Sequence, residues 1–307
     1  MIEAKSLCKR YDNILAVDNL SFTVEAGQVL GFLGPNGAGK STTMKMLTGF
    51  LMPTSGTALI NGIDVVENSV AARECIGYLP EGAPSYGEMT VRQFLTFIAR
   101  ARKIEAADVP GCVADALVRL NLERVQHQPV ETLSKGFKRR VGLAQAIIHD
   151  PQILILDEPT DGLDPNQKHE VRRLIQDMAR DKIIVISTHI LEEVEAVCNR
   201  IMIISDGRLL ADDTPHGLVA RSRYNNTVSM VVEEAEKVAS ILSELPEVAR
   251  AELGNGELTL FPTPQAGLFE AVSAAINQNA WEVSALRLEA GRLDEVFRSI
   301  TRGETSS

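Results

Sequence analysis

The stretch Gly34-Pro35-Asn36-Gly37-Ala38-Gly39-Lys40-Ser41-Thr42 decides the fold, and it directly follows the apolar run Val29-Leu30-Gly31-Phe32-Leu33. It has the pattern G-x-x-x-x-G-K-[ST], in which glycines let backbone N–H groups approach a phosphate without interference from a Cβ atom. Lys40 can reach the β- and γ-phosphates, and the Ser41 hydroxyl can bind Mg²⁺. A helix that begins here also points its positive end at the same anion. The stretch therefore predicts binding of a nucleoside triphosphate.

Length and composition are those of a globular protein with two domains. The chain has 307 residues, of which 45% are hydrophobic and 23% charged, and this is enough for a sizeable core in each domain. A net charge of -10 argues against a surface that tracks nucleic acid. The four scattered cysteines and the absence of a signal-like start predict reduced, mostly buried thiols in a cytosolic protein. No apolar run approaches the ~20 residues that cross a bilayer, so any membrane role is expected from the surface or through a partner.

The first 220 residues alternate between strand and helix patterns. Residues 2–25 and 57–62 read as strands of an antiparallel sheet beside the nucleotide site. Residues 84–150 show apolar side chains at helical spacing and predict a helical subdomain. Buried parallel strands are expected at 153–157, 183–189 and 200–205, with helices between them. Together these patterns predict an α/β fold with an antiparallel β subdomain and a helical subdomain.

Residues 221–307 have a different character. They read as a strand at 227–232, a helix at 235–244, a hairpin of 248–253 and 257–261 around Asn255, a helix at 265–278 and a strand at 281–288. This βαββαβ order is the ferredoxin-like pattern, and residues 293–301 add a last helix. Because no ligand-type residues cluster here, we expect a small α+β domain for regulation or dimerisation.

Acidic residues follow the apolar strand that ends at residue 157. Open α/β sheets bind ligands at the carboxyl ends of their strands, so Asp157 is expected to hold Mg²⁺ and Glu158 to polarise a water for attack on the γ-phosphorus. His189 follows a second buried strand at the same edge, where a sensor of the γ-phosphate would be needed. The remaining histidines lack such a context and are expected on the surface: His127, His149, His169 and His216.

These motifs together resemble the ATP-binding cassette (ABC) family. The resemblance rests on the phosphate loop, on Ile153–Thr160, on Gly162-Leu163-Asp164, on Ser187-Thr188-His189 and on Leu133-Ser134-Lys135-Gly136-Phe137, which occupies the place of the family signature L-S-G-G-Q. It implies that Ser134, Lys135 and Gly136 contact an ATP bound by a second copy of the chain, and that Tyr11 stacks on adenine. It also implies that Glu81 reaches Mg²⁺.

The chain departs from the family pattern at three positions. Lys135 replaces the first signature glycine, Phe137 replaces the glutamine, and Glu81 stands where a glutamine is usual. Glutamate after Gly-Tyr-Leu-Pro is common in the exporter branch, and residues 133–166 and 293–297 look most like the gliding-motility type of that branch.

The resemblance implies an ATPase subunit with ATP and Mg²⁺ as cofactors. By this resemblance it would drive a separate membrane permease for export, from the cytoplasmic face of the cell membrane. It would be a homodimer when ATP is bound and would have no nucleic-acid partner. One alternative stays open: a soluble ABC protein that acts on ribosomes or DNA, which would usually carry two cassettes or a coiled coil. A P-loop kinase is disfavoured, because it would not explain the signature and the His189 strand together. A neighbouring reading frame with about six apolar segments would favour transport. Neither the cargo nor the effect of the three departures follows from the sequence.

Overall fold

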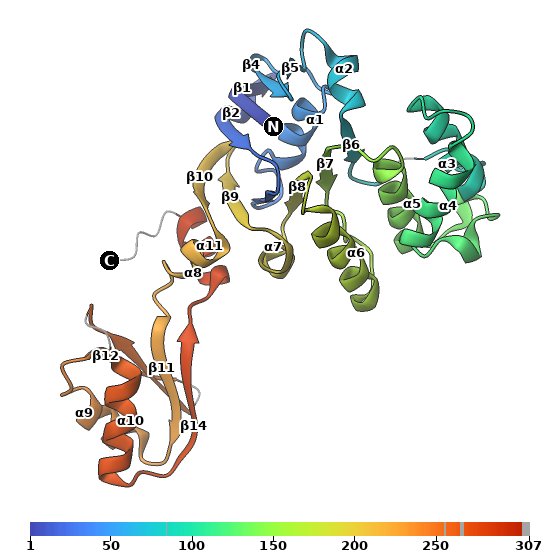
Figure 1. Ribbon diagram of the computed structural model, residues 1–307. Coiled ribbons are helices and arrows are strands. Elements are labelled where there is room, and N and C mark those ends of the chain that lie inside the picture. Colours follow the sequence, from blue (N-terminus) through green and yellow to red (C-terminus); the bar gives the residue numbers. More distant parts are fainter. Residues whose placement is uncertain (84, 255, 265–266, 303–307) are drawn as a thin grey trace. The chain divides into compact units, whose positions relative to one another are not determined.

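The computed structural model divides the chain into two compact units (Figure 1). They are Met1–Asp213 and Thr214–Ser307, and the structure describes residues 1–83, 85–254, 256–264 and 267–302. The boundary lies seven residues before the position expected from sequence, because Pro215–Val219 forms a short helix that belongs to the second unit. Each unit has its own hydrophobic core.

The first unit opens with a four-stranded antiparallel sheet in the order β2-β1-β4-β5. Its strands are β1 (Ile2–Tyr11), β2 (Ile14–Val24), β4 (Ser55–Ile60) and β5 (Ile63–Asp64). Alternate side chains in residues 20–24 of β2 are buried, as the sequence pattern predicts for a sheet with one covered face. The tight turn from β1 to β2 contains Asp12, whose φ of 46° is tolerated best by Gly, Asn and Asp.

A second, six-stranded sheet carries the phosphate loop. Its order is β10-β9-β3-β8-β7-β6, with strands β3 (Val29–Leu33), β6 (Ile76–Leu79), β7 (Ile153–Asp157), β8 (Ile183–Thr188), β9 (Arg200–Ser205) and β10 (Arg208–Asp213). The pairs among β6, β7, β8, β3 and β9 are parallel, whereas β10 pairs antiparallel with β9. Every residue of β3, β7 and β8 is buried, which explains their uninterrupted apolar sequences. The antiparallel edge strand β10 was not predicted.

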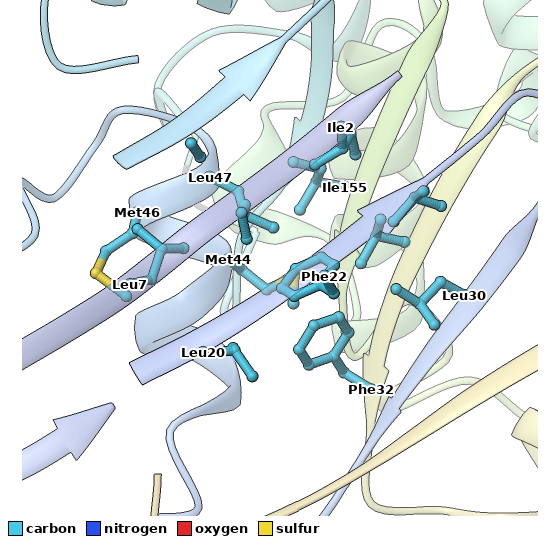
Figure 2. Close-up of a cluster of buried hydrophobic side chains, with 14 of the residues drawn as sticks. Ile2, Leu7, Leu20, Phe22, Leu30, Phe32, Met44, Met46, Leu47 and Ile155 are labelled. Carbon is cyan, nitrogen blue, oxygen red and sulfur yellow. The ribbon is translucent and has the colours of Figure 1, made fainter. Parts of the chain in front are cut away.

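The main core lies between the two sheets. Phe22 of β2 meets Phe32 of β3 edge to face, with ring centroids 5.2 Å apart. Helix α1 (Lys40–Leu47) contributes Met44, Met46 and Leu47 to the same cluster (Figure 2). The helix that begins at the phosphate loop is therefore fixed by buried side chains on both sheets, since each such side chain stabilises by roughly 2 kcal/mol.

Helices make up the rest of the first unit. They are α2 (Ser69–Glu74), α3 (Val91–Ala101), α4 (Val109–Arg119), α5 (Lys135–Ile147), α6 (Pro165–Met178) and α7 (Leu191–Val197), with short 3-10 turns η1 (Glu123–Val125) and η2 (Val130–Thr132). The Thr90 side chain caps α3 in a capping box with Gln93. Helices α3, α4 and α5 contact one another, and α5 packs against β6.

The second unit contains the predicted order of strands and helices. It comprises α8 (Pro215–Val219), β11 (Asn225–Val232), α9 (Ala235–Leu242), β12 (Val248–Gly254), β13 (Glu257–Pro262), α10 (Leu268–Asn279), β14 (Val283–Ala290) and α11 (Leu293–Arg302). The antiparallel sheet has the order β12-β13-β11-β14. Buried residues of α9 and α10 join those of the strands in one core. Asn255 of the predicted hairpin turn and Gln265 at the predicted start of the second helix lie outside the described residues.

Two predictions of burial are wrong. His149 is half-buried rather than exposed, because it lies just beyond α5 with one ring nitrogen 3.3 Å from the Ile76 carbonyl oxygen. Of the four cysteines, which all carry free thiols, only Cys198 is buried. Among the residues that the structure describes, every helix is too short or too polar to traverse a lipid bilayer.

Candidate functional site

The phosphate loop connects β3 to α1 in a backbone conformation that requires glycine. Gly37 and Gly39 have φ values of 82° and 99°, in the left-handed region that favours glycine. A Cβ atom on Gly39 would lie 2.4 Å from the Ala16 carbonyl oxygen, and one on Gly34 would lie 2.2 Å from the Ile204 carbonyl oxygen. The neighbouring backbone therefore excludes other residues at these positions.

The Lys40 side chain curls over the phosphate loop and is almost fully buried. Its Nζ donates to the carbonyl oxygens of Gly34 at 2.7 Å and Pro35 at 3.1 Å. Burial lowers the pKa of Lys40, and nearby carboxylates act in the opposite direction. These carboxylates are Glu158, Asp157 and Glu81. A cation held in this way is placed to meet the negative charge of a bound phosphate.

Strand register brings the acidic residues to the phosphate loop. Strand β8 lies between β3 and β7, with Leu33 paired to Thr188 and Asp157 paired to Ser187. The chain then turns at Glu158, whose φ is 52°. His189 Nδ1 lies 2.8 Å from Glu158 Oε1, so the predicted water-activating carboxylate and the predicted γ-phosphate sensor contact each other directly.

Asp157 is a buried carboxylate whose oxygens have no hydrogen-bond partner among the described residues. It is inaccessible to solvent, and neither carboxylate oxygen has a hydrogen bond. Such a group is costly unless a cation or donor compensates it. Within the described parts of the chain, no cluster of three or more His, Cys, Asp and Glu side chains could hold a metal by itself. Mg²⁺ commonly binds through one or two protein oxygens together with substrate phosphates and water, and Asp157 fits that role.

A pocket of about 250 Å³ lies over the phosphate loop. Its lining consists of Ala16, Asn36, Gly37, Gly39, Lys40, Ser41, Thr42, Glu81 and Glu158. The structure thus gathers the predicted side chains of Lys40, Ser41, Glu81 and Glu158 around one space. Tyr11 is not among the described lining residues, and its exposed ring lies 5.3 Å from Lys9 Nζ. Its predicted stacking on adenine stays a prediction.

The signature segment begins helix α5. The Ser134 hydroxyl accepts from the Phe137 amide at 3.4 Å as the N-cap. Lys135 Nζ forms an ion pair with Asp161 at 2.8 Å. Gly136 is buried against Gly162, where a Cβ atom would lie 3.3 Å from the carbonyl oxygen. None of these three signature residues lines the pocket among the residues described there.

Arg139 is a site residue that the sequence reasoning missed. Its guanidinium donates to the carbonyl oxygens of Asp157 and Glu158, and to that of Pro80 at 3.0 Å. The side chain is buried, and this burial lowers its pKa against the opposing effect of the site carboxylates. Arg139 therefore fixes the ends of β7 and β6 to the signature helix.

A signal for Arg139 exists in the sequence, although it is faint. Gly142 and Ala146 follow at helical spacing, and both lie in close contact with the β6 segment. A Cβ atom on Gly142 would lie 2.6 Å from Ala83, and one on Gly77 would lie 2.1 Å from the Ala146 carbonyl oxygen. Small residues on one face of α5 thus mark a close approach, and Arg139 shares that face.

Glu193 is a second missed residue. It is buried at the start of α7, where its carboxylate accepts from Lys168 Nζ at 3.1 Å and from the Thr188 hydroxyl at 3.2 Å. Thr188 Oγ1 also lies 3.3 Å from Glu158 Oε2. Glu193 therefore supports the residue that precedes His189.

Comparison with known proteins shows that this chain is similar to ATP-binding proteins of ABC transporters. The ABC transporter family matches residues 17–161. An uncharacterized ABC transporter ATP-binding protein of Bacillus subtilis (strain 168) is 32% identical over 300 residues, which cover 98% of this chain and 99% of that protein. The Nod factor export ATP-binding protein I of Rhizobium meliloti is 41% identical over 219 residues, 71% of this chain and 65% of that protein. Other relatives are longer, and this chain spans 41% of the length of two of them.

Among solved structures, the ATP-binding subunit of an ABC transporter is similar to this chain in fold and sequence. The TM-score is 0.67 with 30% sequence identity, and the match covers 71% of this chain and 91% of that one. The predicted α/β fold, with an antiparallel sheet and a helical region attached to a P-loop core, is confirmed.

Proposed function

The chain belongs to the ABC transporter family of ATP-binding proteins, and on this basis we propose that it hydrolyses ATP to power a separate membrane permease. The observation that carries the proposal is the meeting of Lys40, Asp157, Glu158 and His189 at one sheet edge beside the phosphate loop. Each has the chemistry that one part of phosphoanhydride hydrolysis requires.

Binding of the triphosphate depends on the phosphate loop. We propose that N–H groups of residues 37–42 cradle the phosphates, and that Lys40 exchanges its carbonyl contacts for the β- and γ-phosphate oxygens. Burial disfavours the charged form of Lys40 and the three nearby carboxylates favour it. Its contacts with the Gly34 and Pro35 carbonyl oxygens fix its position before the nucleotide arrives. The nucleotide thus enters a site in which the cation is already in place.

Mg²⁺ would be held by the Ser41 hydroxyl and the Asp157 carboxylate, with Glu81 nearby. When bound, it supplies charge neutralisation to the β- and γ-phosphate oxygens. The Asp157 carboxylate, whose oxygens have no hydrogen bond, supports this assignment, because a buried carboxylate needs a donor or a cation at its oxygens. Glu81 lines the same pocket but carries a negative charge where the family usually has a neutral amide.

Glu158 would orient and deprotonate the attacking water. Its carboxylate is four-fifths buried and held by His189 on one oxygen and by Thr188 near the other. The His189 contact would fix the orientation of the carboxylate, and the other ring nitrogen of the imidazole would donate to the γ-phosphate. General-base assistance of this kind contributes ~10²–10⁴-fold to a hydrolysis rate.

We propose that the complete site needs a second copy of the chain. Ser134, Lys135 and Gly136 belong to the family signature yet lie outside the described lining of the pocket. Two copies related by a two-fold axis would each present a signature to the nucleotide of the other. ATP would then join the two chains, and hydrolysis would loosen them.

The permease would contact a groove of about 550 Å³ between α2, β6 and α3. Its lining includes Phe50 and Val70, which are 72% and 63% exposed. It also includes three basic residues and one acidic residue, Arg73, Arg102, Lys103 and Glu74, the last of which pairs with Lys103. An apolar permease segment with acidic residues would complement both features. Tyr78 also lines the groove, only three residues before Glu81, so an occupant there can influence the nucleotide site.

We infer export as the direction of transport, because a similar protein is named for export of Nod factor and because residues 133–166 resemble the gliding-motility type of the exporter branch. The subunit would then work at the cytoplasmic face of the cell membrane. The cargo would be chosen by the permease.

The test is release of phosphate from ATP-Mg²⁺ by the full chain. We expect Glu158→Gln to bind ATP as the native protein does but to release phosphate at least 100-fold more slowly. Asp115→Asn, which removes an exposed ion pair with Arg119 on α4, serves as the control with a native rate. A native rate in Glu158→Gln would refute the assignment. Phe50→Asp should keep the hydrolysis rate of the isolated chain and lose association with membranes that contain the permease.

A further inference from the structure

The signature lysine is paired within its own chain. Lys135 Nζ lies 2.8 Å and 3.1 Å from the two carboxylate oxygens of Asp161. This pair lowers the pKa of Asp161. The aliphatic part of the Lys135 side chain lies across Gly162, where a Cβ atom would be 2.6–3.0 Å from Cδ, Cγ and Cε. Lys135 is thus aimed at Asp161 by its packing as well as by charge.

The loop that holds Asp161 connects the signature to the catalytic carboxylate. The Asp161 amide donates to the Glu158 carbonyl oxygen at 3.1 Å, so the two residues share one tight turn. At the other end of the loop, Asp164 caps α6 by accepting from the Gln167 amide at 2.9 Å. The loop is therefore held at both ends, and Asp161 projects from its middle.

The ion pair can open at little cost. The side chains of Lys135 and Asp161 are 70% and 52% exposed, and exposed pairs of this kind contribute only a small amount to stability. A phosphate carries more negative charge than a carboxylate and binds a lysine more strongly. The ammonium group could rotate away from Asp161 while its stem stays on Gly162.

We propose that Asp161 competes with the ATP of a second copy for Lys135, and so sets the ATP concentration at which two chains join. This inference rests on the proposed function, because it requires the signature to meet ATP in a second copy. In the free chain Asp161 neutralises Lys135. In the dimer Lys135 turns to the γ-phosphate oxygens of the partner's nucleotide, and Asp161 is released beside Glu158.

The experiment measures the dimer fraction by light scattering as ATP-Mg²⁺ is titrated, with all variants built on Glu158→Gln so that ATP is not consumed. We expect Asp161→Asn to lower the ATP concentration for half-maximal dimer by about three-fold, the range open to an exposed ion pair. Lys135→Ala should raise it. Asp161→Glu, which keeps the charge, should restore a threshold close to that of the parent.

The decisive comparison is the double variant. In the Lys135→Ala background Asp161→Asn should have no further effect, because the cation for which the two groups compete is gone. Asp115→Asn is the matched control, and thermal unfolding and monomer ATP affinity confirm that each variant is folded. Equal thresholds for Asp161→Asn and the control, or an undiminished effect of Asp161→Asn without Lys135, would overturn this inference and leave the proposed function intact. If the Glu158→Gln parent forms no dimer at any ATP concentration, both this inference and the proposed site shared between two copies are refuted.

Discussion

Arg139 offers the sharpest test of how the site is held together, and Arg139→Gln is the informative change. The guanidinium bridges three backbone carbonyl oxygens, those of Pro80, Asp157 and Glu158. Glutamine is shorter and uncharged, so it can satisfy one of these acceptors at most. The substitution also removes a buried positive charge from among the site carboxylates.

The expected loss of stability in Arg139→Gln follows from these contacts. A hydrogen bond with a charged partner contributes ~1.5–3 kcal/mol, and an acceptor left buried and unsatisfied costs ~1–3 kcal/mol. Burial of the guanidinium itself costs free energy in the native protein, which offsets part of this sum. We therefore expect a loss of about 3–4 kcal/mol in the free energy of unfolding. In a unit of this size that corresponds to a decrease of about 10 °C in the thermal midpoint.

The assay pairs thermal unfolding with ATP-Mg²⁺ binding, and Arg140→Gln is the matched control. Arg140 is the next residue on α5 and is equally buried, but it donates to the carbonyl oxygens of Leu120 and Asn121, away from the strand ends. We expect both variants to be less stable. Only Arg139→Gln should also weaken ATP-Mg²⁺ binding, by about tenfold. A tenfold loss of affinity corresponds to about 1.4 kcal/mol, which we expect as the cost of a displacement at the ends of β6 and β7. Equal ATP-Mg²⁺ affinities in the two variants would refute the positioning role of Arg139, and a native thermal midpoint would refute the estimate of its contribution.

Three further predictions follow from the same structure. Lys40→Ala should abolish hydrolysis and weaken ATP binding, because it removes the cation that we propose contacts the β- and γ-phosphates. Titration of a fluorescent analogue measures the binding, and native affinity with full turnover would contradict the assignment. Glu81→Gln should leave the fold unchanged and alter the hydrolysis rate or its response to the permease, since it neutralises a charge in the pocket; identical rates with and without permease would place Glu81 outside the site. Burial holds the pKa of His149 at about 4, below its ordinary 6.5. As the pH decreases, the unfolded chain therefore takes up a proton at this residue before the folded chain does. The free energy of unfolding falls as pH decreases from 6.5 towards 4. After allowance for the partial exposure of the ring, His149→Gln should reduce the loss of stability between pH 7.5 and pH 5 by about 1 kcal/mol. Denaturant titrations at the two pH values measure this change. An unchanged pH dependence would show that the ring is not buried as described.

The features predictable from sequence are those that depend on local pattern. The phosphate loop follows from glycine chemistry at fixed spacing, and the buried strands β3, β7 and β8 follow from uninterrupted apolar runs. The position of Asp157 beside β8 follows from the rule that parallel strands end at one edge. Each of these inferences uses a rule that acts over a few residues.

The features that escaped prediction depend on contacts between distant segments. Arg139 lies in a run of basic residues that reads as a solvated helix face, and only the approach of β6 shows that it is buried. His149 is covered by the β6 segment for the same reason. Strand β10 and helix α8 carry short, weak patterns, so the domain boundary was placed late. The ion pair of Lys135 with Asp161 joins residues 26 positions apart, and spacing alone gives no indication of it.

The central claim is that a working site is shared between two chains, and the molecular mass of Glu158→Gln in solution tests it most directly. The variant keeps the shape of the side chain and removes the carboxylate that we propose activates water, so it should hold ATP unhydrolysed. Light scattering should give a mass near 33.4 kDa without nucleotide and about twice that value with ATP-Mg²⁺. Adding Ser134→Arg should return the mass to that of the monomer while ATP binding persists, because the change blocks the contact with the second copy and leaves the phosphate loop untouched. A monomer under both conditions, at protein and ATP concentrations well above the ATP affinity, would contradict the account.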